Sequence, residues 1–380
     1  MTRPVYVHDL TALAAHAAAI RAALPPRVEL LYATKANPDP GMLRTLAPVV
    51  DGFEAASGGE LRHLGTVLPD RPPAALAGPG KTDRDLAAAL AARVRRIHVE
   101  SPAELHRLAR LARAAGTPAD VLLRVNLPVT VAGAALVMGG APSPFGMSPA
   151  EALRCLRRPP DGVRVRGVHA HLASGLDPDT AATVAGAVVD WAVSQAGVTE
   201  VNVGGGMAVD YADPGARFDW PRYGQRLASL LDPYPELLLR IEPGRSVTAY
   251  CAAYLTEVVD VKRSFGDWFV VVAGGTHHLR TPAAKGHAQP FTVHARAGAA
   301  GPRTDGGPVT IVGQLCTPKD VLSRTADAGP IGVGDVLVFG MAGAYAWNIS
   351  HHDFLMHEQP EFRVGDPVRV AGQWAAQRGC

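Results

Sequence analysis

The chain has 380 residues, a formal net charge of +2 and a hydrophobic content of 47%. This length suggests two domains or one large domain, and the nearly balanced charge gives no reason to expect a nucleic acid or a membrane surface as partner. Four scattered cysteines without C-x-x-C spacing suggest neither a disulfide framework nor a zinc knuckle. No apolar run reaches membrane-spanning length and the first residues lack a signal-peptide core, so we expect a cytoplasmic protein.

The first two thirds of the chain alternate between strand-like and helical patterns. A short strand is expected at 4–7, followed by an Ala-rich helix that Asp9 can cap. Eight further strands alternating with helices over about 220 residues predict a (β/α)8 barrel, and the G-x-G-x-x-G turn that would favour a doubly wound open sheet is absent. The expected strands are 28–35, 51–55, 74–79, 96–100, 120–126, 163–172, 199–205 and 236–243, and the clearest helices are 83–94, 102–114, 178–196 and 222–231.

After about residue 250 the pattern changes to short strands separated by Gly, Pro and Asp, with little helix between them. This texture predicts an all-β domain at the C-terminal end. The expected strands are 268–273, 291–295, 309–312, 336–339 and 368–371.

Chemistry in such barrels lies at the C-terminal ends of the strands, where Lys35 ends the first predicted barrel strand. A lysine there is costly unless its charge is paired or removed. It is either a reactive amine that forms a Schiff base with an aldehyde cofactor, or a structural side chain whose amine reaches solvent.

The ends of the seventh and eighth strands carry an anion-binding pattern. The glycines 204–206 let backbone amides approach an anion, and Arg245 adds a rigid, positively charged guanidinium group. Together they favour a phosphate site over a flexible turn. A phosphate site and an amine at one barrel mouth suggest pyridoxal phosphate. Glu242 could keep its pyridine nitrogen protonated, or could only pair with Arg245. His171 could lie flat on the ring, or be an ordinary hydrogen-bonded histidine.

Seven motifs together resemble the alanine-racemase-fold, pyridoxal-phosphate-dependent decarboxylases, the group of diaminopimelate and eukaryotic ornithine decarboxylases. The resemblance covers nearly the whole chain. The motifs occur in the order Tyr32–Asn37, Ser57–Leu61, His169–Ser174, Gly204–Gly206, Glu242–Arg245, Cys316–Asp320 and Gly343–Tyr345.

The resemblance implies a pyridoxal-phosphate-binding (β/α)8 TIM barrel over 25–250 and a C-terminal all-β barrel domain. Residues 1–24 and 251–380 would form that second domain, because the first strand of the family joins it. It also implies a homodimer with two shared active sites.

The resemblance further implies roles for individual residues. Lys35 would form the covalent link to the cofactor aldehyde, His171 would stack on the ring, and Glu242 would pair with the pyridine nitrogen. Cys316 would enter from the partner subunit and protonate the substrate carbon after CO2 leaves. The phosphate would be bound by Ser174, Gly204, Gly205, Gly206, Gly244 and Arg245, with Tyr345 reaching the same region.

One position departs from the diamino-acid decarboxylases. The residue after the catalytic cysteine is usually acidic there and holds the substrate's distal amine, but here it is Thr317. A buried charge pair of this kind contributes roughly 2–5 kcal/mol, so lysine-like or ornithine-like products are disfavoured.

Nearby segments are rich in histidine and arginine instead. We expect Thr317, Asp320, His277, Arg280 and His351 to contact the substrate, which would suit one that carries several carboxylates. The loops containing His277/His278 and His351/His352 could also be solvated or hold a metal, although no second ligand cluster is evident and no metal is expected.

Residues 344–355 also resemble the siderophore-biosynthesis branch of the family, which acts on a citryl–diaminopropionate conjugate. The leading hypothesis is therefore an amino-acid decarboxylase that converts such an intermediate to an ethylenediamine-type amine. The enzyme alternative is a diaminopimelate or other diamino-acid decarboxylase. Racemisation is disfavoured by Glu242, where racemases of this fold have arginine. The non-enzyme alternative is a pyridoxal-phosphate carrier or regulatory pseudoenzyme.

Overall fold

The computed structural model describes residues 3–68, 70, 74–129, 136–280, 288–296 and 301–376. Contacts divide the chain into two units. The barrel unit comprises Ala14–Val209 and Arg217–Val247, and the β unit comprises the described residues of Met1–Leu13, Asp210–Ala216 and Thr248–Cys380. Helix α1 (Leu10–Ala23) runs through the first division without a break. The expected domain bounds of 25 and 250 stay a prediction.

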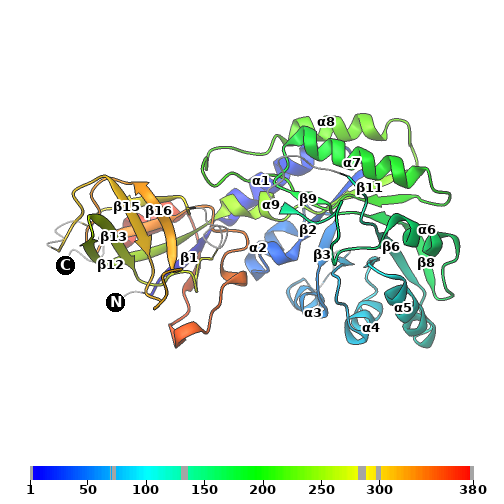
Figure 1. Ribbon diagram of the computed structural model, residues 1–380, viewed down its shortest axis with the longest axis horizontal. Helices are drawn as coiled ribbons and strands as arrows, with labels where there is room; N and C mark the ends of the chain where they lie inside the picture. The colour runs from blue at the N-terminus through cyan, green and yellow to red at the C-terminus, as the bar shows by residue number, and fades with distance from the viewer. Residues whose placement is uncertain are drawn as a thin grey trace. The chain divides into compact units, whose positions relative to one another are not determined.

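Eight parallel strands close into a barrel in the barrel unit, which confirms the predicted (β/α)8 fold and contradicts the open-sheet alternative (Figure 1). Closure is complete because β11 pairs with β10 on one side and with β2 on the other. The strands are β2 (Val28–Ala33), β3 (Gly52–Ala55), β4 (Ala74–Leu76), β5 (Arg96–Val99), β6 (Ala119–Arg124), β8 (Val163–His169), β10 (Glu200–Asn202) and β11 (Leu238–Ile241).

The barrel helices begin where a capping side chain follows a strand, and they lie outside the strands in Figure 1. Each capping side chain accepts a hydrogen bond from a backbone N–H of the first turn, which satisfies a group that the helix itself leaves unpaired. The helices and their caps are α2 (Pro40–Leu46, Asp39), α3 (Gly58–Val67, Ser57), α4 (Asp83–Ala91, Thr82), α5 (Pro102–Ala114, Ser101), α6 (Pro149–Arg157, Ser148), α7 (Pro178–Val193, Asp177) and α8 (Trp220–Leu231, Asp219).

An ion-pair network ties four barrel strands together. The buried guanidinium of Arg240 lies 2.5 Å from a carboxylate oxygen of Glu29 and 2.6 Å from one of Glu200. Arg96 donates a second hydrogen bond to Glu200 at 2.6 Å. Burial alone would raise the pKa of Glu200, but the hydrogen bonds and charges of Arg96 and Arg240 lower that pKa to about 2.

The β unit contains an eight-stranded, mostly antiparallel sheet, which confirms the predicted all-β character. Strand β1 (Val5–His8) pairs antiparallel with β12 (Ala252–Ser264) and parallel with β18 (Glu361–Val364), so the N-terminal strand belongs to this sheet. The remaining strands are β13 (Asp267–Val272), β14 (Phe291–His294), β15 (Pro308–Val312), β16 (Val321–Asp327) and β17 (Val336–Phe339).

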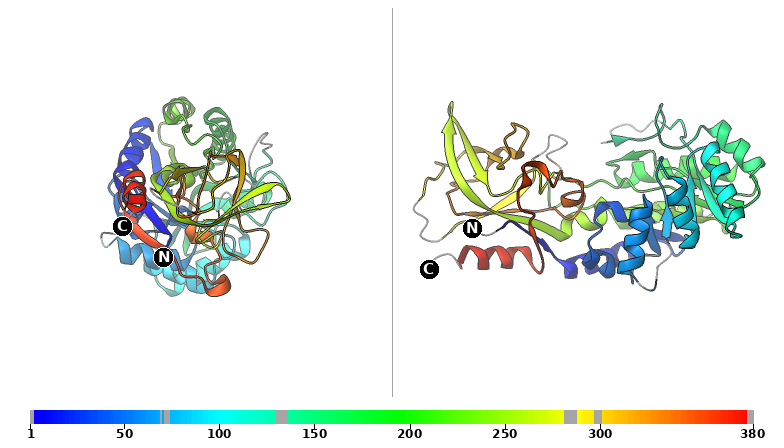
Figure 2. Two further views of the ribbon diagram at one scale, coloured as in Figure 1. Left: turned by 90° about the vertical axis from the view of Figure 1, so that its left-hand side faces the viewer. Right: turned by 90° about the horizontal axis from the view of Figure 1, so that it is seen from below.

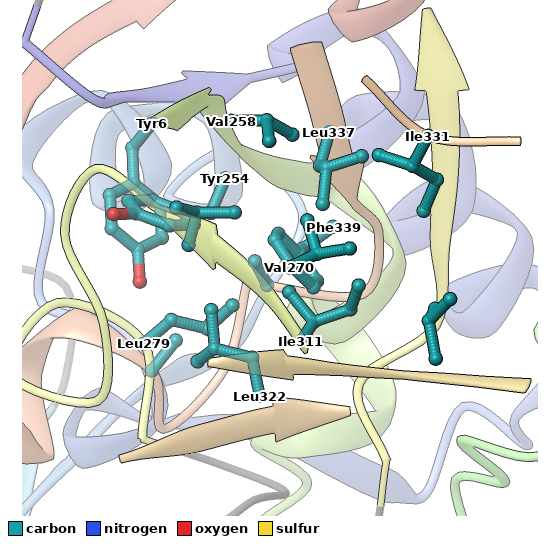
Figure 3. Close-up of a cluster of buried hydrophobic side chains, with 14 of the residues drawn as sticks. Tyr6, Tyr254, Val258, Val270, Leu279, Ile311, Leu322, Ile331, Leu337 and Phe339 are labelled. Carbon is teal, nitrogen blue, oxygen red and sulfur yellow. The ribbon is translucent and has the colours of Figure 1, made fainter. Parts of the chain in front are cut away.

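One face of this sheet carries the core shown in Figure 3, where Tyr6, Tyr254, Val270, Ile311 and Phe339 pack together. Helix α10 (Pro367–Ala376) lies alongside β1 in Figure 2 and covers the other face.

The expected strand at 368–371 is wrong, because this segment lies inside α10. Asp366 starts the helix by accepting from the backbone N–H of Val368 at 2.8 Å. The residues that pack on the sheet are Val370, Ala371, Trp374 and Ala375, which is a helical and not a strand spacing.

Among the helices that the structure describes, none is both long and apolar enough to cross a membrane.

Candidate active site

Lys35 lies in a single 3-10 turn (Thr34–Ala36) directly after β2, and 44% of its side chain is exposed. Its Nζ atom is 2.5 Å from Oε2 of Glu54, a buried carboxylate in β3. Burial raises the pKa of Glu54 above its ordinary value; Lys35 opposes this and Glu242 adds to it. The cost of a lysine at a strand end is thus met by pairing, and the amine remains within reach of solvent.

The barrel unit contains two of the five lysines of the chain, Lys35 and Lys81. The side chain of Lys81 is 1% exposed, and its Nζ atom lies 2.9 Å from Glu104 and donates to the carbonyl of Gly78 at 2.5 Å. Because Lys81 is enclosed and Lys35 is accessible, Lys35 is the amine of the barrel unit that a small molecule can reach.

His171 follows β8 and is held in one orientation by the glycine segment. The backbone N–H of Gly205 donates to His171 Nδ1 at 3.2 Å, so in the neutral ring the proton lies on Nε2. Burial lowers the pKa of His171 well below its ordinary value, and the positive charges of Lys35 and Arg124 lower it further. The ring is therefore neutral and fixed at the same end of the barrel as Lys35.

The three glycines after β10 are needed for close backbone approach. A Cβ atom on Gly204 would lie 2.6 Å from a His171 ring nitrogen, and one on Gly206 would lie 2.3 Å from the carbonyl oxygen of Ala173. The amide of Gly204 is already used, because it donates to Asn202 Oδ1 at 2.9 Å. The amides of Gly204 and Gly205 thus serve contacts within the barrel, and the predicted phosphate role of this segment stays a prediction.

The other expected phosphate-site residues follow neighbouring strands. Ser174 lies in the short strand β9 (Ala173–Ser174), and Arg245 begins the short helix α9 (Arg245–Thr248) after Gly244. The register pairs Asn202 of β10 with His169 of β8 and with Arg240 of β11, so these three strands end side by side. The structure therefore brings the three predicted anion-binding segments to one edge of the barrel.

Glu242 lies just after β11 and is buried. Its Oε1 atom accepts a hydrogen bond from the side-chain amide of Asn202 at 2.7 Å. Two buried histidines lie beside the carboxylate: His98 Nδ1 is 3.8 Å from Oε1 and His169 Nε2 is 3.4 Å from Oε2.

In the β unit, Cys316 is an exposed free thiol on a turn organised by Asp320. The buried Asp320 carboxylate accepts hydrogen bonds from the backbone N–H groups of Leu315 (2.8 Å) and Thr276 (2.6 Å) and from the Thr276 hydroxyl (2.8 Å). Thr317 lies within the same turn and donates its backbone N–H to Leu315 at 2.7 Å. These bonds favour a structural role for Asp320 over the expected substrate contact.

The two histidines at 277 and 278 are buried, which contradicts the solvated-loop alternative for this pair. Burial and the nearby histidines, chiefly His357, lower the pKa of His277 to about 4. His278 Nε2 donates to the carbonyl of Glu358 at 2.8 Å, and its Nδ1 accepts from the Tyr254 hydroxyl at 2.9 Å, so this ring joins two segments of the β unit.

Three further expected residues of the β unit are more open. Arg280 and His351 are exposed, as expected of groups available to a ligand. Tyr345 is half-buried and has a backbone φ of +49°, a conformation that costs a non-glycine residue about 1–3 kcal/mol and is concentrated at functional sites.

Comparison with known proteins identifies the family. The model of the pyridoxal-dependent decarboxylase family, pyridoxal binding domain, matches residues 10–249, well over half of the chain. The chain belongs to this family. It is therefore a pyridoxal-phosphate-dependent amino-acid decarboxylase, and the carrier and pseudoenzyme alternatives are set aside.

Several relatives match over most of their length. The chain is 36% identical to the 2-[(L-alanin-3-ylcarbamoyl)methyl]-2-hydroxybutanedioate decarboxylase of Staphylococcus aureus, covering 94% of this chain and 92% of the relative. It is 31% identical to the diaminopimelate decarboxylase of Pseudomonas aeruginosa, covering 91% and 84%. The crystal structure of diaminopimelate decarboxylase from Helicobacter pylori with L-lysine shares the fold at a TM-score of 0.85 and 21% identity, covering 96% and 92%.

The residues at the barrel mouth fit the family's cofactor. Lys35 offers an accessible amine for its aldehyde, the fixed ring of His171 offers a flat surface, and the carboxylate of Glu242 offers an acceptor for a protonated pyridine nitrogen. Glycines at 204–206 leave room where any side chain would collide with the barrel.

Sequence reasoning missed Asn202 and His98 as neighbours of Glu242. Asn202 lies two residues before Gly204, at the end of β10, so its position beside the glycine segment could have indicated it. His98 lies in the middle of β5, and only closure of the barrel shows that its ring reaches the end of β11.

Proposed function

We propose that this decarboxylase removes the α-carboxylate of an amino-acid unit within a carboxylate-rich conjugate of the citryl–diaminopropionate type. The observation that carries the proposal is the Cys316 turn. Thr317 occupies the position at which the diamino-acid decarboxylases usually have an acidic residue. The acidic side chain within residues 315–320, Asp320, is buried with both oxygens bonded inside the β unit. The turn thus offers no free carboxylate to a distal ammonium.

The S. aureus relative supports the same substrate class, because its name describes an L-alanin-3-ylcarbamoyl group joined to a hydroxybutanedioate. The exposed Arg280 and His351 are cationic or hydrogen-bonding groups that suit distal carboxylates. The buried, neutral His277 is a weaker candidate for this contact than the sequence suggested.

Lys35 would hold the cofactor through its amine and release it to the amine of the substrate. Glu54 Oε2, 2.5 Å away, can take the proton from Lys35 Nζ and leave the amine nucleophilic. The bound cofactor supplies an electron sink for the bonding electrons when CO2 departs. Glu242 would keep the pyridine nitrogen protonated, and the neutral ring of His171 would cover one face of the cofactor.

Cys316 would complete the reaction from a second copy of the chain. We propose a homodimer in which Sγ of Cys316 of the partner subunit donates a proton to the substrate carbon that lost CO2. The exposed thiol on a turn fixed by Asp320 supports this role. A cytoplasmic location, in which the free thiols of the described cysteines would persist, is part of the same proposal.

The substrate assignment is tested by supplying enzyme and pyridoxal 5'-phosphate with the citryl–diaminopropionate conjugate or with meso-diaminopimelate. We expect CO2 and an ethylenediamine-type product from the conjugate, with a kcat/KM far above that for diaminopimelate. Replacing Thr317 with Asp or Glu should shift this preference toward diaminopimelate. Efficient turnover of diaminopimelate together with none of the conjugate would contradict the proposal and favour the alternative activity, which the P. aeruginosa relative represents.

A further inference from the structure

Two buried histidines form a stacked pair inside the barrel, beside the carboxylate of Glu242. The rings of His98 in β5 and His169 at the end of β8 have centroids 4.2 Å apart and planes inclined by 16°. Both side chains are buried, and the nitrogen atoms nearest to Glu242 lie 3.8 Å and 3.4 Å from its oxygens. None of the four ring nitrogens of the pair makes a hydrogen bond within the described residues.

Burying these two histidines inside the barrel is energetically unfavourable. The interior of such a barrel is usually filled by layers of branched apolar side chains. A buried polar atom without a partner costs about as much as its full desolvation, so native proteins rarely keep such atoms without a reason. Four such ring nitrogens, two of them within 4 Å of one carboxylate, therefore call for a functional explanation.

The charges around the pair determine what it can do. The cations Lys35, Lys81 and Arg124 oppose a further positive charge on the rings, whereas Glu242 favours one on His98. Glu54 is a second carboxylate close to Glu242. Burial together with these cations lowers the pKa of both histidines well below the ordinary value. Each ring is therefore neutral and has one N–H to donate.

We propose that His169, backed by the stacked ring of His98, is a positioning residue that donates its Nε2–H to Glu242 and orients this carboxylate toward the cofactor. Asn202 already donates to Oε1 at 2.7 Å, and His169 lies on the side of Oε2, so the two donors would fix both oxygens. The proposed hydrogen bond requires the His169 ring to reorient from its present 3.4 Å approach to Oε2. The inference rests on the proposed role of Glu242.

The physical consequence concerns where one proton lies. A carboxylate that accepts two hydrogen bonds is a weaker base, so the proton shared between it and a pyridine nitrogen stays on the nitrogen. Without the donor from His169, Glu242 becomes a stronger base and draws the proton toward itself. The effectiveness of the electron sink would fall accordingly.

The test is the 15N signal of holoenzyme loaded with ring-15N pyridoxal 5'-phosphate, because this signal reports whether the nitrogen carries a proton. His169→Phe keeps the ring volume and removes the donor, whereas His169→Gln keeps an N–H near the position of Nε2. We expect His169→Phe to move the signal toward that of an unprotonated pyridine and to weaken cofactor binding about ten- to hundredfold. His169→Gln should remain close to wild type, and His98→Phe should have a smaller effect than His169→Phe.

The Glu242→Gln background separates this inference from the proposed function. We expect His169→Phe to add no further change there, since the acceptor is gone. A signal and an affinity unchanged in His169→Phe, with Glu242→Gln impaired, would overturn the inference and leave the role of Glu242 intact. A signal unchanged in Glu242→Gln would overturn both, while turnover of the citryl conjugate would still support the substrate assignment.

Two measurements on the wild-type protein guard against a variant that does not fold. With 13C-labelled histidine, the His169 resonance should not titrate between roughly pH 5 and 9 and should shift when the cofactor is added. A His169 resonance that ignores the cofactor would overturn the inference. The second measurement is metal analysis, because His98, His169 and Glu242 are near enough to one another to chelate an ion. A stoichiometric metal in the wild-type protein that is lost in His169→Phe would also overturn the inference.

Discussion

At the scale of the residue, the Lys35–Glu54 pair shows what sequence reasoning can and cannot supply. The special position of Lys35 could be predicted from the sequence, because a charge at the end of a buried strand needs a partner. The partner was not, because Glu54 lies in the neighbouring strand and its orientation depends on the barrel. The same limit applies to Glu242, whose nearest side chains come from β5, β8 and β10.

Replacing Glu54 with Gln removes the group that can take the proton of Lys35. We expect kcat/KM to fall about 10²- to 10⁴-fold, as for the loss of a general base, while the protein stays folded. Because Glu54 must be ionised to accept the proton, wild-type activity should rise with pH through its raised pKa, and this acid limb should be absent in the variant. Glu60→Gln is the matched control, since Glu60 bonds the backbone N–H of Ala56 and not Lys35. An unchanged pH profile in Glu54→Gln would contradict the assignment.

At the scale of the element, local signals predicted more than long-range contacts did. All eight barrel strands were placed correctly because apolar segments and helical stretches alternate regularly. The segment 368–371 was misassigned because Val368 and Val370 favour a strand locally, whereas packing on the sheet selects the helix. The role of Asp320 depends on Thr276, a distant residue that no local pattern points to.

The Cys316 turn yields a prediction that separates structure from substrate contact. Asp320→Asn places an amide donor against the N–H groups of Leu315 and Thr276, leaving buried donors unsatisfied. We expect a loss of about 1–3 kcal/mol in the free energy of unfolding and a lower kcat, with KM nearly unchanged. Chemical denaturation and steady-state kinetics measure both. A raised KM at unchanged stability would instead support the substrate contact expected from the sequence.

At the scale of the whole molecule, closure of the barrel brings together charges that lie far apart in the chain. Arg240, Glu29, Glu200 and Arg96 come from β11, β2, β10 and β5 and form one buried network. Removing one partner of such a network is costly because it leaves a buried charge unpaired.

The network makes stability depend on pH in a definite direction. The pKa of Glu200 is lowered to about 2 from an ordinary value of 4.5, so its contribution is complete above pH 4.5 and is lost as the pH falls toward 2. The expected loss is about 3 kcal/mol in the free energy of unfolding. Urea denaturation across this range should give a steeper pH dependence for the wild type than for Glu200→Gln. Equal slopes would show that Glu200 titrates normally.

The proposed homodimer is tested by complementation between two variants. Lys35→Ala lacks the cofactor amine, and Cys316→Ala should bind the cofactor but reprotonate poorly, so each alone should be nearly inactive. In a shared site, a mixed dimer of the two contains one intact site, and an equal mixture should recover about a quarter of wild-type activity if subunits exchange at random. Lys319→Ala, in the same turn as Cys316, is the control that should behave as wild type. No recovery in co-expressed, purified mixed dimers would mean that Lys35 and Cys316 act within one chain or not together.

The identity of the cofactor-bearing lysine tests the account most directly. Reduction of the holoenzyme with borohydride, followed by digestion and mass spectrometry, fixes the pyridoxyl group to whichever lysine holds it. We predict a single modified peptide containing Lys35, because Lys81 is enclosed by Glu104 and Gly78. Modification of Lys81 or of a β-unit lysine, with Lys35 unmodified in active enzyme, would contradict the account.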